Sequence, residues 1–254
     1  MQIAADSQTP IELEIPFELK ALANSHNYQR WAANAVLPYL GRSILEVGAG
    51  IGNMTRWLPR REKLVITETD PTLFRLLIAD LATQPNGTAD VKVLQADATR
   101  GFHPGLTDDV DTVVSFNVLE HIDDDASALR NQLDVLRNSS AERPRRLVVF
   151  VPAHSWLYGS LDRIFGHYRR YSHRDLIAKL AAIEPQAKIT YRYFNTIGIF
   201  GWFLVGRVLK KNELGAGSIK AFELLCPIFS KISDAMNLTL RLPFGQSLIV
   251  VAEL

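Results

Sequence analysis

The stretch Ile44-Leu45-Glu46-Val47-Gly48-Ala49-Gly50-Ile51-Gly52 decides the fold of this 254-residue chain. It begins as a short apolar run, which is typical of a buried strand. Three glycines follow within five residues, and glycine lets a backbone turn tightly and come close to a ligand. We therefore predict a strand over 43–47, a ligand-binding turn, and a helix from Asn53 to about Leu58.

A strand–helix rhythm continues after this turn. Strands are predicted over 64–67, 91–94, 112–116 and 146–151, and helices over 72–82 and 125–136. This alternation predicts a parallel sheet with helices on both faces, in which buried strands read as continuous apolar runs. Ligands of such sheets bind outside the carboxyl ends of the strands, so the candidate site residues are sought there.

The flanking segments complete the predicted elements. Residues 21–40 have apolar side chains at helical spacing, and Gly41 ends that helix. After the core come a helix over 174–183, a strand over 188–194, apolar helices within 196–240 that are split at 215–217, and a final strand over 247–252. The block 196–240 is thus an insertion before the last strand, well placed to cover a site.

The glycine turn narrows the choice of ligand. A dinucleotide fingerprint reads G-x-G-x-x-G, and here Asn53 follows the last glycine in a different pattern, E-x-G-x-G-x-G. A phosphate loop needs a lysine followed by serine or threonine, and no such pair follows Gly52. The pattern instead resembles the first motif of class I S-adenosylmethionine-dependent methyltransferases.

That resemblance implies an α/β, Rossmann-like class I methyltransferase fold, with a seven-stranded, mostly parallel sheet and a reversed last strand. In the family, the loop matching Gly48, Gly50 and Gly52 packs against the methionine part of S-adenosylmethionine, and the carboxylate matching Glu46 lies near its ammonium group. S-adenosylhomocysteine is the implied product. The resemblance covers residues 25–152 strongly and the rest more weakly.

Two further strand ends carry acids that match the family. Glu68 matches the acid that accepts both ribose hydroxyls, whereas Asp70 stands where it would cap the next helix. Asp97 and Ala98 match the residues that bind the adenine amino group and ring. The alternative for Asp97 is a turn aspartate that binds its own backbone.

The fourth strand and the first helix supply three more candidates. Asn117 is predicted to contact the cofactor, and His121 is a candidate general base that has a structural role in many family members. Arg30 matches a residue that folds over the cofactor and pairs with its carboxylate. The alternative is a surface arginine beside Tyr28 and Trp31 in the core.

Residues 153–173 are rich in aromatic and basic side chains. Their Pro-Ala-His and His-Tyr-Arg-Arg-Tyr patterns resemble a subgroup of bacterial small-molecule methyltransferases. Because the segment follows a central strand, it is predicted to border the substrate. His154 or His167 would deprotonate a hydroxyl acceptor, and Arg169 or Arg170 would hold a carboxylate.

The same segment allows a purely structural interpretation. Tyr158, Tyr168 and Tyr171 would line an aromatic substrate pocket in the functional interpretation. In the structural one, ion pairs with Asp162 and Asp175 lock the segment to the sheet. No His, Asp or Glu spacing resembles a motif such as H-E-x-x-H, so no metal is predicted.

The amino-acid composition narrows the classes of function that are expected. The chain has 28 basic and 27 acidic residues, so no broad basic surface for nucleic acid is expected. Cys226 is the single cysteine, which excludes an intrachain disulfide. The first residues lack the basic and apolar regions of a secretory signal, and we expect a cytoplasmic protein.

The apolar block 196–240 has three interpretations. It would cover a hydrophobic substrate, form a dimer interface, or touch a membrane through Arg207, Lys210 and Lys211, and we favour them in that order. A monomer and a homodimer both stay open.

The sequence therefore predicts one methyltransferase domain over 1–254. Its parts are an N-terminal helical segment (1–40), a cofactor-binding core (41–152), a substrate-side segment with a helical lid (153–245) and the last strand (246–254). The predicted reaction is methylation, most simply at oxygen, of a small hydrophobic or aromatic acceptor. A nicotinamide-dependent oxidoreductase and a non-catalytic S-adenosylmethionine-binding module are the alternatives.

Overall fold

The computed structural model describes residues 15–83, 90–103, 105, 107–209, 215–240 and 244–254. Seven strands among them form one sheet in the order β3-β2-β1-β4-β5-β7-β6. Their bounds are β1 Ser43–Val47, β2 Lys63–Glu68, β3 Asp90–Gln95, β4 Thr112–Phe116, β5 Arg146–Pro152, β6 Lys188–Phe194 and β7 Ser247–Glu253. Strand β7 is antiparallel to both of its neighbours, and the other neighbouring pairs are parallel. The predicted mostly parallel sheet with a reversed last strand is confirmed.

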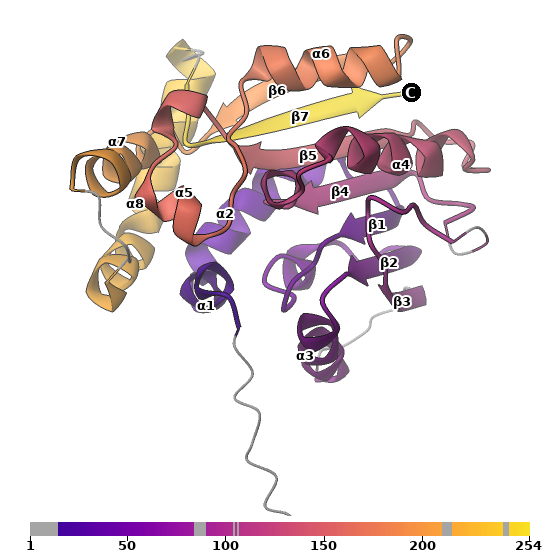
Figure 1. Ribbon diagram of the computed structural model, residues 1–254, viewed down its shortest axis with the longest axis horizontal. Coiled ribbons are helices and arrows are strands. Elements are labelled where there is room, and N and C mark those ends of the chain that lie inside the picture. Colours follow the sequence, from indigo (N-terminus) through magenta and orange to yellow (C-terminus); the bar gives the residue numbers. More distant parts are fainter. Residues whose placement is uncertain (1–14, 84–89, 104, 106, 210–214, 241–243) are drawn as a thin grey trace, which may run out of the picture.

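Helices cover both faces of this sheet (Figure 1). Helices α4 (Asp125–Arg137) and α6 (His173–Ile183) pack on one face, and α2 (His26–Val36), α3 (Pro71–Ala82) and α8 (Ala216–Leu240) supply side chains to the other. Because successive strand residues point to opposite faces, Leu45 belongs to the first apolar core and Ile44 to the second. The two cores hold the strand ends rigidly in place.

The N-terminal helix differs from the prediction. Instead of one helix over 21–40, the chain forms α1 (Phe17–Ala23), then α2, then a 3₁₀ turn over Leu37–Tyr39. The break falls at Asn24 and Ser25, whose side chains compete with the backbone for hydrogen bonds; the Ser25 hydroxyl donates to the Ala21 carbonyl. This break lets α1 turn toward the carboxyl ends of the strands, where Figure 1 shows it.

The prediction of a helix after the glycine turn is also wrong. Residues 55–57 form only a 3₁₀ turn, and Leu58 is extended, with φ −73° and ψ 141°. Pro59 explains this, because a proline forces the residue before it out of the helical region.

The remaining helices gather at the carboxyl ends of the parallel strands (Figure 1). They are α5 (Ser160–Ile164), α7 (Gly198–Trp202) with the π-helical turn Phe203–Val208, and α8. The predicted insertion before the last strand is thus present. None of the described helices is long and apolar enough to cross a membrane.

Helices α7 and α8 leave many apolar side chains exposed. Leu224 is 78% exposed and Phe200 is 67% exposed, far more than core residues of the same type. Arg207 donates to the Tyr158 carbonyl, while Lys210 and Lys211 lie outside the described residues. The dimer and membrane interpretations of this surface stay predictions.

Candidate active site

A cavity of about 510 Å³ opens beside the glycine turn, and we call it the cofactor cavity. The ends of four neighbouring strands contribute to its wall. The predicted residues that line it are Glu46, Gly48, Gly50, Glu68, Asp97, Ala98, Asn117 and His121. Gly52 lies just behind this wall, where its Cβ would meet the Leu77 side chain at 3.1 Å. The structure thus brings eight predicted residues together at one cavity.

The glycine turn needs glycine for two reasons. Gly48 has φ 69° and Gly50 has φ 60°, a left-handed backbone that other residues rarely adopt. A Cβ at Gly48 would also lie 2.7 Å from a methyl carbon of Val118. The turn thus brings its backbone directly against the loop after β4.

Glu68 and Asp70 have separate roles. Asp70 caps α3, since its Oδ1 accepts hydrogen bonds from the backbone of Thr72 and Leu73. Glu68 is buried at the end of β2 and accepts from the backbone N–H of Gly50 at 2.7 Å. Glu68 Oε1 also accepts from the backbone N–H groups of Thr69 and Asp70, and both acids line the cofactor cavity.

Glu46 is a buried acid behind the turn. Its Oε2 has no hydrogen-bond partner. Burial raises the pKa of Glu46 to about 7, and the nearby Glu68 charge adds to this. A cationic ligand group next to Glu46 would stabilise the carboxylate that burial now disfavours.

Asp97 is a partly exposed acid just after the end of β3. Asp97 Oδ1 accepts from both the N–H and the hydroxyl of Thr99, and these bonds lower the pKa of Asp97. The alternative interpretation of a turn aspartate is therefore observed. It does not exclude a ligand contact, because Asp97 and Ala98 both line the cavity.

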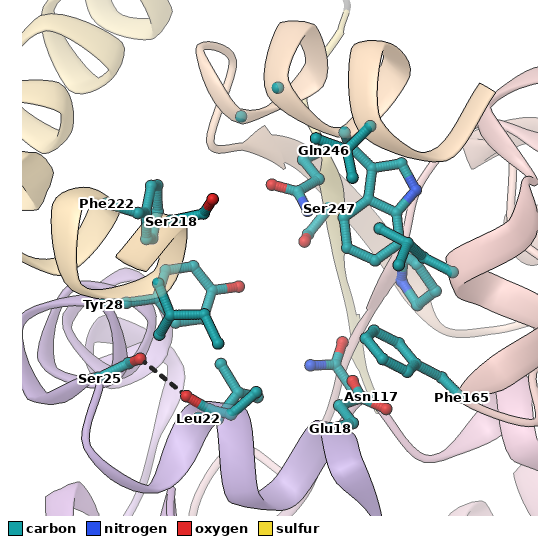
Figure 2. Close-up of a pocket in the computed structure, with 18 of the residues that line it drawn as sticks. Glu18, Leu22, Ser25, Tyr28, Asn117, Phe165, Ser218, Phe222, Gln246 and Ser247 are labelled. Carbon is teal, nitrogen blue, oxygen red and sulfur yellow. Dashed lines mark hydrogen bonds between the residues drawn. The ribbon is translucent and has the colours of Figure 1, made fainter. Parts of the chain in front are cut away.

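A second cavity of about 440 Å³ adjoins the first, and we call it the acceptor cavity. Most of its lining is apolar, from α1, α2, α5, α7 and α8. Figure 2 shows Ser218 and Phe222 of α8 on one side, Phe165 on the other, and Glu18 and Asn117 at its lower edge. The predicted lid therefore walls a cavity, as the substrate-cover interpretation requires.

The two cavities share part of their walls. Glu18, Leu22, Tyr28, Asn117 and Phe165 line both. Asn117 has φ 51°, and its N–H donates to the Phe150 carbonyl, which fixes the loop after β4 between the cavities. The same five residues would therefore contact ligands in both cavities.

A histidine–carboxylate cluster of Glu18, Glu120, His121 and His167 borders both cavities. Glu18 Oε2 lies 3.5 Å from Nε2 of His121 and 3.5 Å from Nε2 of His167. His167 is buried, and its Nδ1 lies 2.9 Å from Asp162 Oδ1. The cluster concentrates the ionisable groups of an otherwise apolar cavity at the shared wall.

The charges of this cluster follow from burial and pairing. Burial alone would lower the pKa of His167, but its contacts with Asp162 and Glu18 raise it to about 9. Burial likewise opposes ionisation of Glu18, yet the two histidines lower its pKa to about 2. Burial raises the pKa of Glu120 to about 7, and neither of its carboxylate oxygens has a hydrogen-bond partner.

Arg30 and His154 are among the predicted site residues that line neither described cavity. Arg30 is exposed, and its guanidinium carbon lies 4.9 Å from the ring centroid of Trp57. Its neighbour Gln29 lines the cofactor cavity instead, because α2 turns that side inward. His154 stacks on Tyr193, with ring centroids 4.9 Å apart, and it lines neither of the two described cavities.

The aromatic–basic segment is mostly structural. Tyr158 donates to the His167 carbonyl, Tyr171 donates to Asp125, and Arg169 pairs with Asp123 and Asp125. None of these three predicted substrate residues lines either described cavity. They lock the segment to the sheet, as the structural interpretation predicted.

The ion-pair and hydrogen-bond partners of this segment differ in part from the prediction. Asp162 does pair with Arg170, at 2.6 Å. Asp175 instead bonds Ser172 at the start of α6. Tyr168 is 58% exposed and lies under Arg169, away from both cavities. Arg170 is the exception, since it is buried and lines the acceptor cavity.

Sequence reasoning missed Glu18 and Glu120. Glu18 lies before the helix that was predicted over 21–40, and it reaches the cavities because α1 folds back over the strand ends. Glu120 directly precedes the candidate base His121 in the sequence. Its complete burial without a hydrogen-bond partner was the missing signal, and only the folded structure provides it.

Comparisons with known proteins agree with this geometry. Residues 45–141 match the family model described as a methyltransferase domain. A search of curated proteins gives no match. A solved SAM dependent methyltransferase from Archaeoglobus fulgidus is 14% identical, with a TM-score of 0.56 and coverage of 94% of this chain and 98% of that chain.

Two other solved structures share the fold. The [4+2]-cyclase SpnF is 14% identical, with a TM-score of 0.58 and coverage of 88% of this chain and 80% of its own. The plantazolicin methyltransferase BamL, solved with a desmethyl analogue and SAH, is 8% identical, with a TM-score of 0.51 and coverage of 92% and 84%. At such identities the likeness establishes the fold. Residues 45–141 thus match a methyltransferase-domain model, and the chain shares the fold of a solved SAM dependent methyltransferase.

Proposed function

We propose that this protein transfers the methyl group of S-adenosylmethionine from the cofactor cavity to an acceptor in the adjoining cavity. The observation that carries the proposal is the shared wall of the two cavities, formed by Glu18, Leu22, Tyr28, Asn117 and Phe165. Methyl transfer is a direct displacement at carbon, so the two ligands must meet in line. Adjacent cavities meet that requirement.

The cofactor cavity suits S-adenosylmethionine in charge as well as shape. Glu46 would face the ammonium group, Glu68 the ribose hydroxyls and Asp97 the adenine amino group, with each acid at the end of a different strand. The glycine turn gives close backbone approach without a phosphate group to bind. The absence of a full helix after the turn speaks against a dinucleotide, whose pyrophosphate is stabilised at a helix N-terminus.

The acceptor is proposed to be hydrophobic, with one polar group at the reacting end. The far wall of its cavity is apolar, with Trp202, Phe222 and Phe229 among its residues. The near wall carries Glu18, which is ionised at neutral pH because its pKa is about 2. A hydroxyl on the acceptor would donate to this carboxylate, which favours oxygen as the methylated atom.

Calorimetric titration tests cofactor binding. The wild type is expected to bind S-adenosylmethionine and S-adenosylhomocysteine with one site, and to bind NAD and NADP much more weakly. Glu68→Gln keeps the shape but loses the charge that two ribose hydroxyls need, so affinity should fall about 10- to 100-fold. The control Asp90→Asn changes an exposed acid at the start of β3 and should leave affinity unchanged.

Two results would reject the cofactor assignment. One is a folded wild-type protein that binds neither adenosyl ligand. The other is tighter binding of a dinucleotide, which would revive the oxidoreductase alternative. Binding without turnover on any acceptor would favour a non-transferring role, and the fold does accommodate one, since the similar SpnF structure is named a [4+2]-cyclase.

A further inference from the structure

We propose that Glu18, His121 and His167 form a binding site for a divalent transition-metal ion at the wall between the two cavities. Their ligand atoms all lie within 4.8 Å of one another. The set has two imidazoles and one carboxylate, which is a known set for zinc sites that keep one position open for water or substrate. This inference deepens the proposed methyl transfer and rests on it only for the role of the ion.

The spacing of the ligand atoms fits an ion better than direct pairing. Glu18 Oε2 lies 3.5 Å from each histidine Nε2. Charge-assisted hydrogen bonds are shorter, at about 2.7–2.9 Å. Bonds of about 2.1 Å to a tetrahedral zinc ion separate neighbouring ligand atoms by about 3.4 Å. Two of the three separations therefore match those around a tetrahedral ion, and the two histidine nitrogens lie within 4.8 Å of each other.

A neighbouring carboxylate prepares His167 for this role. Asp162 Oδ1 lies 2.9 Å from His167 Nδ1, so that nitrogen holds the proton and Nε2 faces the cluster. Metal-binding histidines almost always bond a carboxylate, carbonyl or water through their other nitrogen. Arg170 in turn fixes Asp162 at 2.6 Å. His167 is thus oriented by its neighbours toward the proposed ion.

Unpaired buried atoms point to a ligand at the same place. His167 Nε2 is buried, and Glu18 Oε2, which lies 3.5 Å away, makes no hydrogen bond with it. Both carboxylate oxygens of Glu120 are also buried without a partner, and Glu120 is completely buried. Buried polar atoms in native proteins are almost always paired, and an unpaired one needs an explanation. A bound cation would offset the charge of Glu120 and complete the coordination of His167.

The ligand types favour zinc or a similar transition metal over magnesium. Imidazole suits zinc, iron and nickel, whereas magnesium prefers oxygen ligands and several waters. His121 lines the cofactor cavity, and His167 lines the acceptor cavity. The ion would therefore lie where the acceptor oxygen meets the methyl group.

In that position the ion would activate the acceptor. A hydroxyl bound at the open position becomes more acidic and gives its proton to Glu120. The acceptor oxygen then attacks the methyl carbon of S-adenosylmethionine. The O–C bond forms as the C–S bond breaks, and the electron pair stays on sulfur. The products are the methyl ether and neutral S-adenosylhomocysteine.

Metal titration of the tag-free wild-type protein tests the site. After dialysis against a chelator, one equivalent of Zn²⁺ or Co²⁺ should bind, with Mg²⁺ far weaker. Bound Co²⁺ should show the visible absorption bands of a four- or five-coordinate ion. The competing interpretation is a metal-free network, in which protonated histidines pair with Glu18.

Two variants and a control locate the binding. His121→Asn should weaken Zn²⁺ and Co²⁺ binding about 100-fold and abolish the Co²⁺ bands; its side chain is 35% exposed, so folding should persist. Glu18→Gln should weaken binding about 10-fold or more. His26→Gln changes a histidine outside both described cavities and should leave binding unchanged.

Failure of this inference is distinguishable from failure of the proposed function. S-adenosylmethionine is titrated into the same preparations. Adenosyl binding without stoichiometric Zn²⁺ or Co²⁺ binding, or metal binding that survives His121→Asn, would overturn the metal site and leave methyl transfer standing. Metal binding lost in His121→Asn, with no adenosyl binding, would support the site and reject the cofactor assignment.

Discussion

At the scale of single residues, Gly48 shows how the sequence fixes the site. Its φ of 69° is strained for other residues, and a Cβ would lie 2.7 Å from the Val118 side chain. Both constraints act on the Cβ that any other residue would have at position 48, so a change of side-chain rotamer could not relieve them. The glycine is required by the turn itself and by the close approach of the loop after β4.

We predict that Gly48→Ala destabilises the protein by about 1–3 kcal/mol and weakens S-adenosylmethionine binding more than 10-fold. Val118→Ala in the same chain should restore part of the stability, because it removes the contact but not the backbone strain. The control Gly217→Ala, at a site with open space, should be neutral or slightly stabilising. Urea unfolding and calorimetry measure these effects; an unchanged Gly48→Ala protein would contradict the geometry.

Glu46 makes stability depend on pH. Its pKa rises from 4.5 to about 7 on folding because it is buried. Between these two values the unfolded chain loses its proton first, so the folded state loses stability as pH rises and reaches a plateau above pH 7. The full loss is about 3 kcal/mol, at about 1.4 kcal/mol for each unit of pKa.

Glu46→Gln should remove this slope. The variant is expected to gain about 2 kcal/mol or more relative to the wild type at pH 8, and much less at pH 5. It should also bind S-adenosylmethionine less tightly, since the ammonium group loses its carboxylate. Urea unfolding at both pH values is the measurement. A gain that is equal at pH 5 and pH 8 would show that Glu46 is not the titrating group.

At the scale of elements, α8 is held at the N-terminus of α2. The Glu223 carboxylate accepts from the backbone N–H of Asn27 at 2.5 Å and of Tyr28 at 3.3 Å. The first N–H groups of a helix have no partner within it, and they carry a partial positive charge. Glu223 thus caps α2 from another element and positions the wall of the acceptor cavity.

We predict that Glu223→Ala destabilises the protein by about 1–2 kcal/mol and speeds hydrogen exchange in the first turn of α2. Lys220→Ala, an exposed position one turn earlier on α8, should change stability by less than about 0.5 kcal/mol. Equal effects of the two substitutions would mean that Glu223 contributes only through its surface charge.

The elements also show what a sequence can predict. Strands β1, β2 and β4 are buried throughout and each has a run of apolar residues, from which their positions follow. The break between α1 and α2 does not follow from the pattern, because apolar spacing continues through it and only Asn24 and Ser25 mark the end of α1. Strands buried on both faces leave a clear pattern, whereas short helices at the rim depend on tertiary contacts.

At the scale of the whole molecule, the cofactor side was predictable and the acceptor side was not. The residues at the ends of β1, β2, β3 and β4 belong to one regular architecture, so a motif fixes their places. Glu18, Phe165, Trp202 and Phe222 come from segments far apart in the sequence, and only their packing brings them together. The aromatic–basic segment drew attention by its composition, yet most of its side chains lock the segment rather than face a ligand.

The central claim is that the methyl group of the cofactor faces the acceptor cavity across the shared wall. The most direct test is isotope-filtered NMR of the protein with S-adenosylmethionine that carries a ¹³C-labelled methyl group. The account predicts nuclear Overhauser contacts from that methyl group to Leu22, Tyr28 and Phe165, which line both cavities. Contacts only to residues at the opposite end of the cofactor cavity, such as Leu73 and Ala96, would contradict it.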